Sequence, residues 1–148
     1  MSENPPLGTS RYDAPMELTY APGACNIGPD EIARRRRVAV IGLIGTIALA
    51  GALIVSGAAT GNPIRLLVAL PLTSAAIGWI QAQRRFCMAY GLAGTFNLGK
   101  IGEMNRVSDQ AALAADRRTA LLIAAQGLAI GIVGSVLFLL LPVALPRT

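Results

Sequence analysis

The feature that most constrains this chain is an uncharged stretch of 23 residues at positions 38–60. About 20 apolar residues in a helix cross the hydrocarbon core of a bilayer. The stretch directly follows four consecutive arginines, residues 34–37. Upstream, Pro29 fits the first helical position, and two acidic residues follow it where the helix dipole favours negative charge. These residues predict a membrane-spanning helix that begins at a positively charged face.

Two further apolar runs, residues 64–82 and 121–141, are also long enough to cross a bilayer. The chain as a whole is 53% hydrophobic and 14% charged, whereas soluble domains average about 25% charged residues. Arg65 lies at the start of the second run, and we expect its side chain to snorkel to the membrane interface. The sequence therefore predicts an all-α integral membrane protein with three transmembrane helices.

The segment between the second and third runs is harder to place. Residues 86–106 contain four glycines and three aromatic residues, and this composition is too interrupted for a span. We expect an interfacial or re-entrant cytoplasmic segment over residues 86–120, with Ser108 as a helix N-cap. The helix after Ser108 should continue unbroken into the third span. Residues 1–24 read as an extended cytoplasmic tail, and residues 25–148 as a single membrane domain.

The basic residues fix the expected orientation. With three spans and a cytoplasmic N-terminus, eleven of the 13 lysines and arginines lie on the cytoplasmic side, as the positive-inside rule requires. This predicts a multi-pass protein of the bacterial inner membrane whose C-terminus lies outside. The basic residues next to the predicted spans, which we expect to set topology and contact lipid, are Arg34, Arg35, Arg36, Arg37, Arg84, Arg85, Arg117 and Arg118.

Several kinds of chemistry are disfavoured by composition. The chain has no histidine, which excludes histidine acid–base catalysis and imidazole ligands to zinc or haem. No ionisable residue lies in the middle of a predicted span, where transporters commonly place one. Gln126 is the one strongly polar residue well inside the third span, and we expect it to hydrogen-bond a neighbouring helix. We predict no cofactor, no metal and no nucleic-acid partner; bound lipid fits the basic flanks.

Two cysteines are the candidates for reactive groups. Cys25 precedes the first predicted helix and Cys87 follows the second, so the predicted topology places both at the cytoplasmic face. There they could form a thiol pair or a soft-metal site. The alternative is that both serve as small apolar fillers. A structural disulfide is not expected, since cytoplasmic thiols are kept reduced.

Small residues recur at every fourth position within the predicted spans, a spacing that lets helix backbones approach closely in lipid. The sequence leaves open whether they pack within the chain or against a partner. The positions are Gly42, Thr46 and Ala50 in the first span, Ser74 and Gly78 in the second, and Gly127, Gly131 and Ser135 in the third.

The stretches CNIGPDEIARR at residues 25–35 and RFCMAYGLAGT at residues 85–95 flank two apolar runs. This arrangement resembles the small two-helix YgaP-like inner-membrane domain of bacteria, over about residues 25–99. Some members of that family accompany rhodanese domains that handle persulfide sulfur, which implies a role for Cys87. Met88 stands where that family usually has proline. The matching positions are Asn26, Glu31, Arg34, Cys87, Tyr90 and Gly94.

These patterns lead to two functional hypotheses. The first is a non-enzymatic accessory or structural subunit, which packs against other integral membrane proteins or against copies of itself. The second is a thiol-based module that handles sulfur or a soft metal at the cytoplasmic membrane face.

Overall fold

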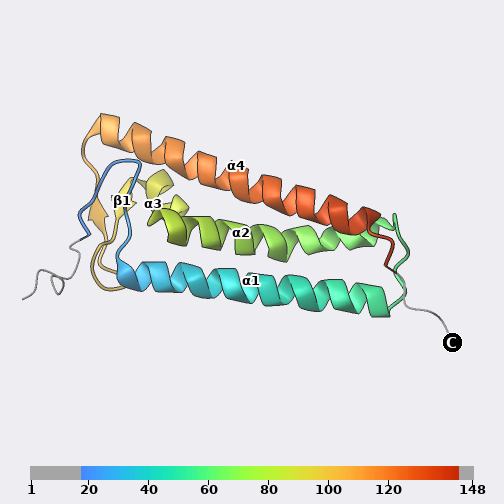
Figure 1. The fold of residues 1–148 in the computed structure, drawn as a ribbon. Coiled ribbons are helices and arrows are strands. Elements are labelled where there is room, and N and C mark those ends of the chain that lie inside the picture. The colour runs from blue at the N-terminus through green and yellow to red at the C-terminus, as the bar shows by residue number, and fades with distance from the viewer. Residues whose placement is uncertain (1–17, 144–148) are drawn as a thin grey trace, which may run out of the picture.

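The computed structural model describes residues 18–143, which form a layer of three long helices with a folded cap at one end. Helix α2 (Ala69–Arg84) lies between α1 (Pro29–Val55) and α4 (Gln110–Leu140), and the three axes run side by side (Figure 1). The cap, called here the polar cap, comprises residues 18–28 and 85–109 together with the first turns of α1 and α4, residues 29–35 and 110–119. The other end of the layer, called the turn end, comprises residues 56–65 and 138–143. The predicted tail over residues 1–17 lies outside the described residues.

The first helix, α1 (Pro29–Val55), begins as the sequence predicts, with Pro29 in the first turn followed by Asp30 and Glu31. It ends at Val55, five positions before the end of the predicted span. The break occurs where Ser56 donates its amide to Ala52 and Gly57 adopts a positive φ of 79°. A left-handed residue of this kind closes many helices, and glycine adopts it without a Cβ clash.

The second predicted span forms two elements. A 3-10 helix, η1 (Pro63–Val68), is capped by the Asn62 side chain, which accepts from the Ile64 amide. It leads directly into α2 (Ala69–Arg84). Arg85 ends α2 in the left-handed region at φ 52°, an uncommon conformation for a residue with a side chain. This turn directs the chain back toward the layer.

Helix α4 (Gln110–Leu140) runs without a break from the polar cap to the turn end, as the sequence predicts for its two halves. Its N-cap differs from the prediction. Asp109, and not Ser108, holds this position, because its carboxylate accepts from the Ala112 amide at 2.9 Å. An N-cap acid both satisfies a free amide and complements the helix dipole.

Residues 86–109 are not purely helical, which corrects the all-α expectation. After the short helix α3 (Met88–Ala93), strands β1 (Thr95–Phe96) and β2 (Asn105–Arg106) pair in antiparallel register. Gly94, at φ 68°, ends α3 in the left-handed region and turns the chain into β1. Gly94, one of the glycines that make this segment a poor candidate for a span, thus allows the chain to turn within a compact fold. In this fold α3 packs on α4.

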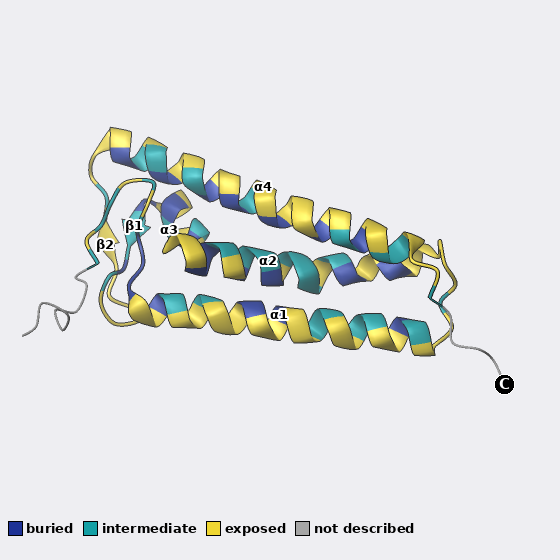
Figure 2. Ribbon diagram, in the orientation of Figure 1, coloured by how far each residue is buried: buried dark blue, intermediate teal, exposed yellow. Residues whose placement is uncertain are grey.

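Three helical segments are long and apolar enough to cross a membrane: Pro29–Val55, Pro63–Arg84 and Gln110–Leu140. Between 17% and 28% of their most apolar stretches is buried within the chain. Much of each long helix is exposed (Figure 2), and many of the exposed residues are large aliphatic ones. An apolar surface of this extent needs lipid or partner helices around it.

Candidate functional site

The polar cap encloses a group of buried polar side chains around Cys87. Cys87 is fully buried at the N-cap position of α3. The Asn26 side chain holds its backbone from both sides. The Asn26 amide nitrogen donates to the Cys87 carbonyl at 3.1 Å, and the Asn26 oxygen accepts from the Cys87 amide at 2.6 Å. This paired contact fixes the end of α2 against the segment that precedes α1.

The Cys87 sulfur faces the first turns of α1. Arg35 Nη2 donates to Cys87 Sγ at 3.0 Å and lies 3.4 Å from Glu31 Oε2. The Glu31 side chain is completely buried, and its other oxygen accepts from the Tyr90 hydroxyl at 3.0 Å. Arg34 also approaches Glu31, at 3.6 Å. Because a buried carboxylate needs charged or hydrogen-bonding partners, these contacts explain how Glu31 is accommodated.

The electrostatics of this group act on Tyr90. Burial, the hydrogen bond to Glu31 and the nearby Glu31 and Cys87 charges raise the pKa of the Tyr90 phenol above its ordinary value. The phenol therefore stays protonated and remains a hydrogen-bond donor to Glu31. Arg35 has one further feature: its Nε is buried without a hydrogen-bond partner.

Close backbone approach at Gly28 holds the site together. The Gly28 amide donates to the Asn97 carbonyl at 2.7 Å, and the Asn97 amide donates to the Asn26 carbonyl at 2.9 Å. A Cβ at Gly28 would collide with the Leu98 carbonyl. Glycine is therefore required where the segment before α1 runs beside the residues that follow β1.

Cys25 is in a different environment from Cys87. Cys25 is half-buried, and within residues 18–143 its sulfur donates one hydrogen bond, to the Ile27 carbonyl of its own segment at 3.9 Å. The two cysteines are free thiols and form no disulfide with each other. Within residues 18–143, no three acidic, cysteine or histidine side chains gather as a metal site would require.

A second buried acid lies in the polar cap, and the sequence did not identify it. Asp116 of α4 is completely buried, and it accepts from the Tyr20 hydroxyl at 2.9 Å and the Gly23 amide at 2.6 Å. Thr119 donates to the Gly23 carbonyl at 2.8 Å. Arg117 and Arg118 follow Asp116 directly, and such a charged group is typical of the headgroup region at the end of a span. Instead, it anchors the segment before α1 onto α4.

Most of the small residues predicted to pack helices lie at contacts within the chain. A Cβ at Gly42 would lie 2.8 Å from the Ala75 backbone nitrogen, and one at Gly78 would lie 2.9 Å from that of Ala39. Glycine therefore allows α1 and α2 to approach closely. Of the other predicted positions, Gly127, Gly131 and Ser135 are buried, Thr46 and Ala50 are half-buried, and Ser74 is exposed.

The arginines that flank the predicted spans gather at the polar-cap end of the layer. Arg35 is half-buried and contacts Cys87. The exposed members of this set are Arg34, Arg36, Arg37, Arg84, Arg85, Arg117 and Arg118. The opposite end has a single described arginine, Arg65, and it does not snorkel outward as expected. It is completely buried and donates five hydrogen bonds to backbone carbonyls.

Comparisons with models of protein families, with curated proteins and with solved structures find no match to this chain. The function of this chain is therefore inferred from the geometry of its own residues.

Proposed function

We propose that this chain is a non-enzymatic accessory subunit of a bacterial inner-membrane complex, with its polar cap in the cytoplasm and its C-terminus outside. The gathering of arginines at the polar-cap end supports this orientation. A periplasmic reporter enzyme fused after residue 148 should be active, and the same reporter fused before residue 1 should be inactive.

The observation that carries the accessory role is Gln126. Its side chain is exposed on α4, about one helical turn inside the predicted span, and it makes no side-chain hydrogen bond to residues 18–143. Leu122 and Val133 are exposed on the same side of α4. A carboxamide surrounded by apolar side chains in lipid gains by hydrogen-bonding another helix. This favours a partner helix that packs along α4.

Mild-detergent purification from native membranes tests this role. The wild-type chain should bring a membrane partner with it. Gln126→Leu should retain about three-fold less partner, since one interhelical hydrogen bond in a membrane averages about 0.6 kcal/mol. Gln110→Leu, the same substitution outside the apolar part of α4, should retain the wild-type amount. A wild-type chain that purifies alone and monomeric would contradict the proposal.

A second candidate is a thiol-based module for sulfur or a soft metal, and the contact between Arg35 and Cys87 favours it. The sulfur is the nucleophilic and metal-binding atom of cysteine, and the Arg35 guanidinium lies within hydrogen-bond distance of it. Four of the six positions that carry the YgaP-like resemblance, Asn26, Glu31, Cys87 and Tyr90, belong to this one hydrogen-bonded group. Their proximity supports the resemblance as a hypothesis.

Thiol trapping and metal analysis distinguish this candidate from the first. Cys87→Ser should lose sulfane-sulfur labelling or bound soft metal, while Cys25→Ser should keep both. Identical results for wild type and both variants would dispose of the thiol module and leave the accessory role untouched.

A further inference from the structure

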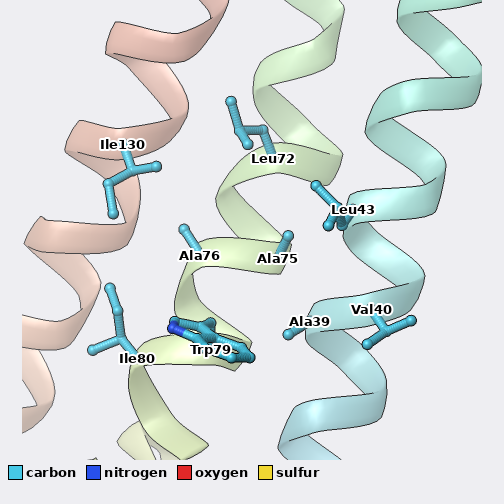
Figure 3. A pocket seen from close by; sticks show the side chains of 9 residues that line it. All are labelled: Ala39, Val40, Leu43, Leu72, Ala75, Ala76, Trp79, Ile80 and Ile130. Carbon is cyan, nitrogen blue, oxygen red and sulfur yellow. The ribbon is translucent and has the colours of Figure 1, made fainter. Parts of the chain in front are cut away.

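One face of the helical layer contains an apolar groove. Because α2 is flanked by α1 and α4, its side chains form the floor of a hollow of about 320 Å³ (Figure 3). Leu43 borders the hollow from α1 and Ile130 borders it from α4, with Ala76 and Trp79 between them. Every residue that lines this hollow is apolar or aromatic.

A second hollow continues this groove toward the polar cap. It measures about 660 Å³, and Arg36, Gln83 and Arg85 are among its lining residues. Arg36 lies four residues before Val40, and Gln83 lies four residues after Trp79, so each pair shares one side of its helix. The two hollows therefore follow one another along the same face. From Leu72 to Gln83 this track is about 16 Å long at 1.5 Å per residue.

Charge is confined to one end of the track. Among residues 18–143, no acidic residue lines either hollow, and neither salt bridge involves Arg36. The Trp79 ring is 55% exposed, and its indole N–H has no acceptor in the described part of the chain. A buried or interfacial indole N–H usually finds a hydrogen-bond partner. The groove thus has a cationic end, an unpaired donor and an apolar remainder.

We propose that this groove binds an anionic phospholipid of the cytoplasmic leaflet. The phosphate lies beside Arg36 and Gln83, and one acyl chain follows the apolar hollow past Trp79. The Trp79 indole donates to an ester carbonyl of the lipid. A partner helix would satisfy the apolar part but not the charged end, whereas a phospholipid with one anionic head matches both. This inference rests on the membrane location proposed above.

Trp79 itself reports on the site, because it is the single tryptophan of the chain. The full-length protein is reconstituted in phosphatidylcholine vesicles that contain a minor fraction of phosphatidylglycerol. Bromine atoms on the acyl chains of one lipid or the other quench the fluorescence of a nearby indole. Brominated phosphatidylglycerol should quench with about five-fold preference over phosphatidylcholine, as expected for one arginine–phosphate attraction at a membrane surface.

The variants distinguish this site from general attraction to the basic face. Arg36→Gln should abolish most of the preference, while Arg37→Gln, an exposed neighbour that lines neither hollow, should keep it. Equal quenching by the two lipids in wild type would overturn the lipid site alone, as would equal losses in the two variants. Quenching by neither lipid would overturn the membrane location as well.

Discussion

The two ends of the helical layer both bury charged side chains, but they neutralise them differently. At the turn end, Arg65 donates only to backbone carbonyls, those of Ala58, Phe138, Leu141 and Val143. In the polar cap, Glu31 is surrounded by the side chains of Arg35, Arg34 and Tyr90. The hydrogen-bond acceptors of Arg65 are carbonyls, which neither titrate nor react as nucleophiles. The group around Glu31 includes the Cys87 thiol and the Tyr90 phenol.

This difference indicates that Arg65 has a structural role, whereas the group around Cys87 is a candidate functional site. The last carbonyls of a helix have no partner within the helix, and Arg65 supplies donors to those at the end of α4. Its guanidinium also lies 5.1 Å from the Phe138 ring centroid, within range of a cation–π contact. The polar cap instead joins ionisable side chains of α1 with those of α3 and its N-cap, so a change in the charge of one group acts on its neighbours.

The largest effect is expected for Arg65→Met. The substitution removes all five donors and leaves buried carbonyls unpaired, so it should destabilise the chain by about 3 to 5 kcal/mol. Equilibrium unfolding in mixed micelles measures the change. Arg65→Lys, which keeps the charge but not the fork of donors, should recover only part of the loss. If Arg65→Met unfolds with the wild-type free energy, the hydrogen bonds of Arg65 do not stabilise the turn end, and its proposed structural role is wrong.

A smaller effect is expected in the polar cap for Asn26→Ala. The variant leaves the Cys87 amide and carbonyl without their paired partner, which should cost about 2 to 3 kcal/mol. The same unfolding assay measures it, and Cys87 should become faster to alkylate because the end of α2 loosens. Asn105→Ala, an exposed asparagine of β2, should change stability by less than about 0.5 kcal/mol. Equal behaviour of the two variants would contradict a central role for Asn26.

The smallest effect concerns pH. Burial and the hydrogen bond to Asp116, with a further contribution from its charge and that of Asp109, raise the pKa of Tyr20 to about 12. Below its unfolded pKa near 10, such a phenol is protonated in both states, so the free energy of unfolding does not depend on its titration. As pH rises from 10 toward 12, the phenol ionises more readily in the unfolded state, which lowers the free energy of unfolding. The contact between Tyr20 and Asp116 should therefore persist in the folded chain until pH approaches 12, while the free energy of unfolding begins to fall above pH 10.

Absorbance titration of the phenolates tests this expectation. Tyr20→Phe should remove the component that ionises near pH 12, and Asp116→Asn should move that component toward pH 10. Ionisation of every tyrosine near pH 10 in the wild-type chain would show that the Tyr20–Asp116 contact does not form in solution.

The sequence predicts the three long helices because hydropathy depends on composition over many residues, which no distant contact changes. The start of α1 at Pro29 is likewise a local property. The predictions fail for residues whose environment depends on contacts with distant parts of the chain. Asp116 resembles a headgroup residue until the segment containing Tyr20 and Gly23 folds back across it. The burial of the Arg65 side chain likewise depends on carbonyls at the end of α4, more than 70 positions away.

Some residues of the candidate site could likewise be predicted from the sequence, and others could not. Cys87 is an evident candidate because thiols are few, and short motifs draw attention to Glu31 and Tyr90. No periodicity in the sequence pairs Asn26 with the Cys87 backbone, since that contact depends on the left-handed turn at Arg85 and on the close approach at Gly28. Such turns depend on φ angles that composition does not specify.

The side-by-side arrangement of α1, α2 and α4 also limits what one copy can conduct. A wall one helix thick encloses no lumen, because each side chain of α2 that avoids its neighbours emerges on one face or the other. A polar solute could cross beside this chain only through a passage whose second wall is supplied by another protein. The described helices of a single copy therefore form one wall and enclose no passage of their own.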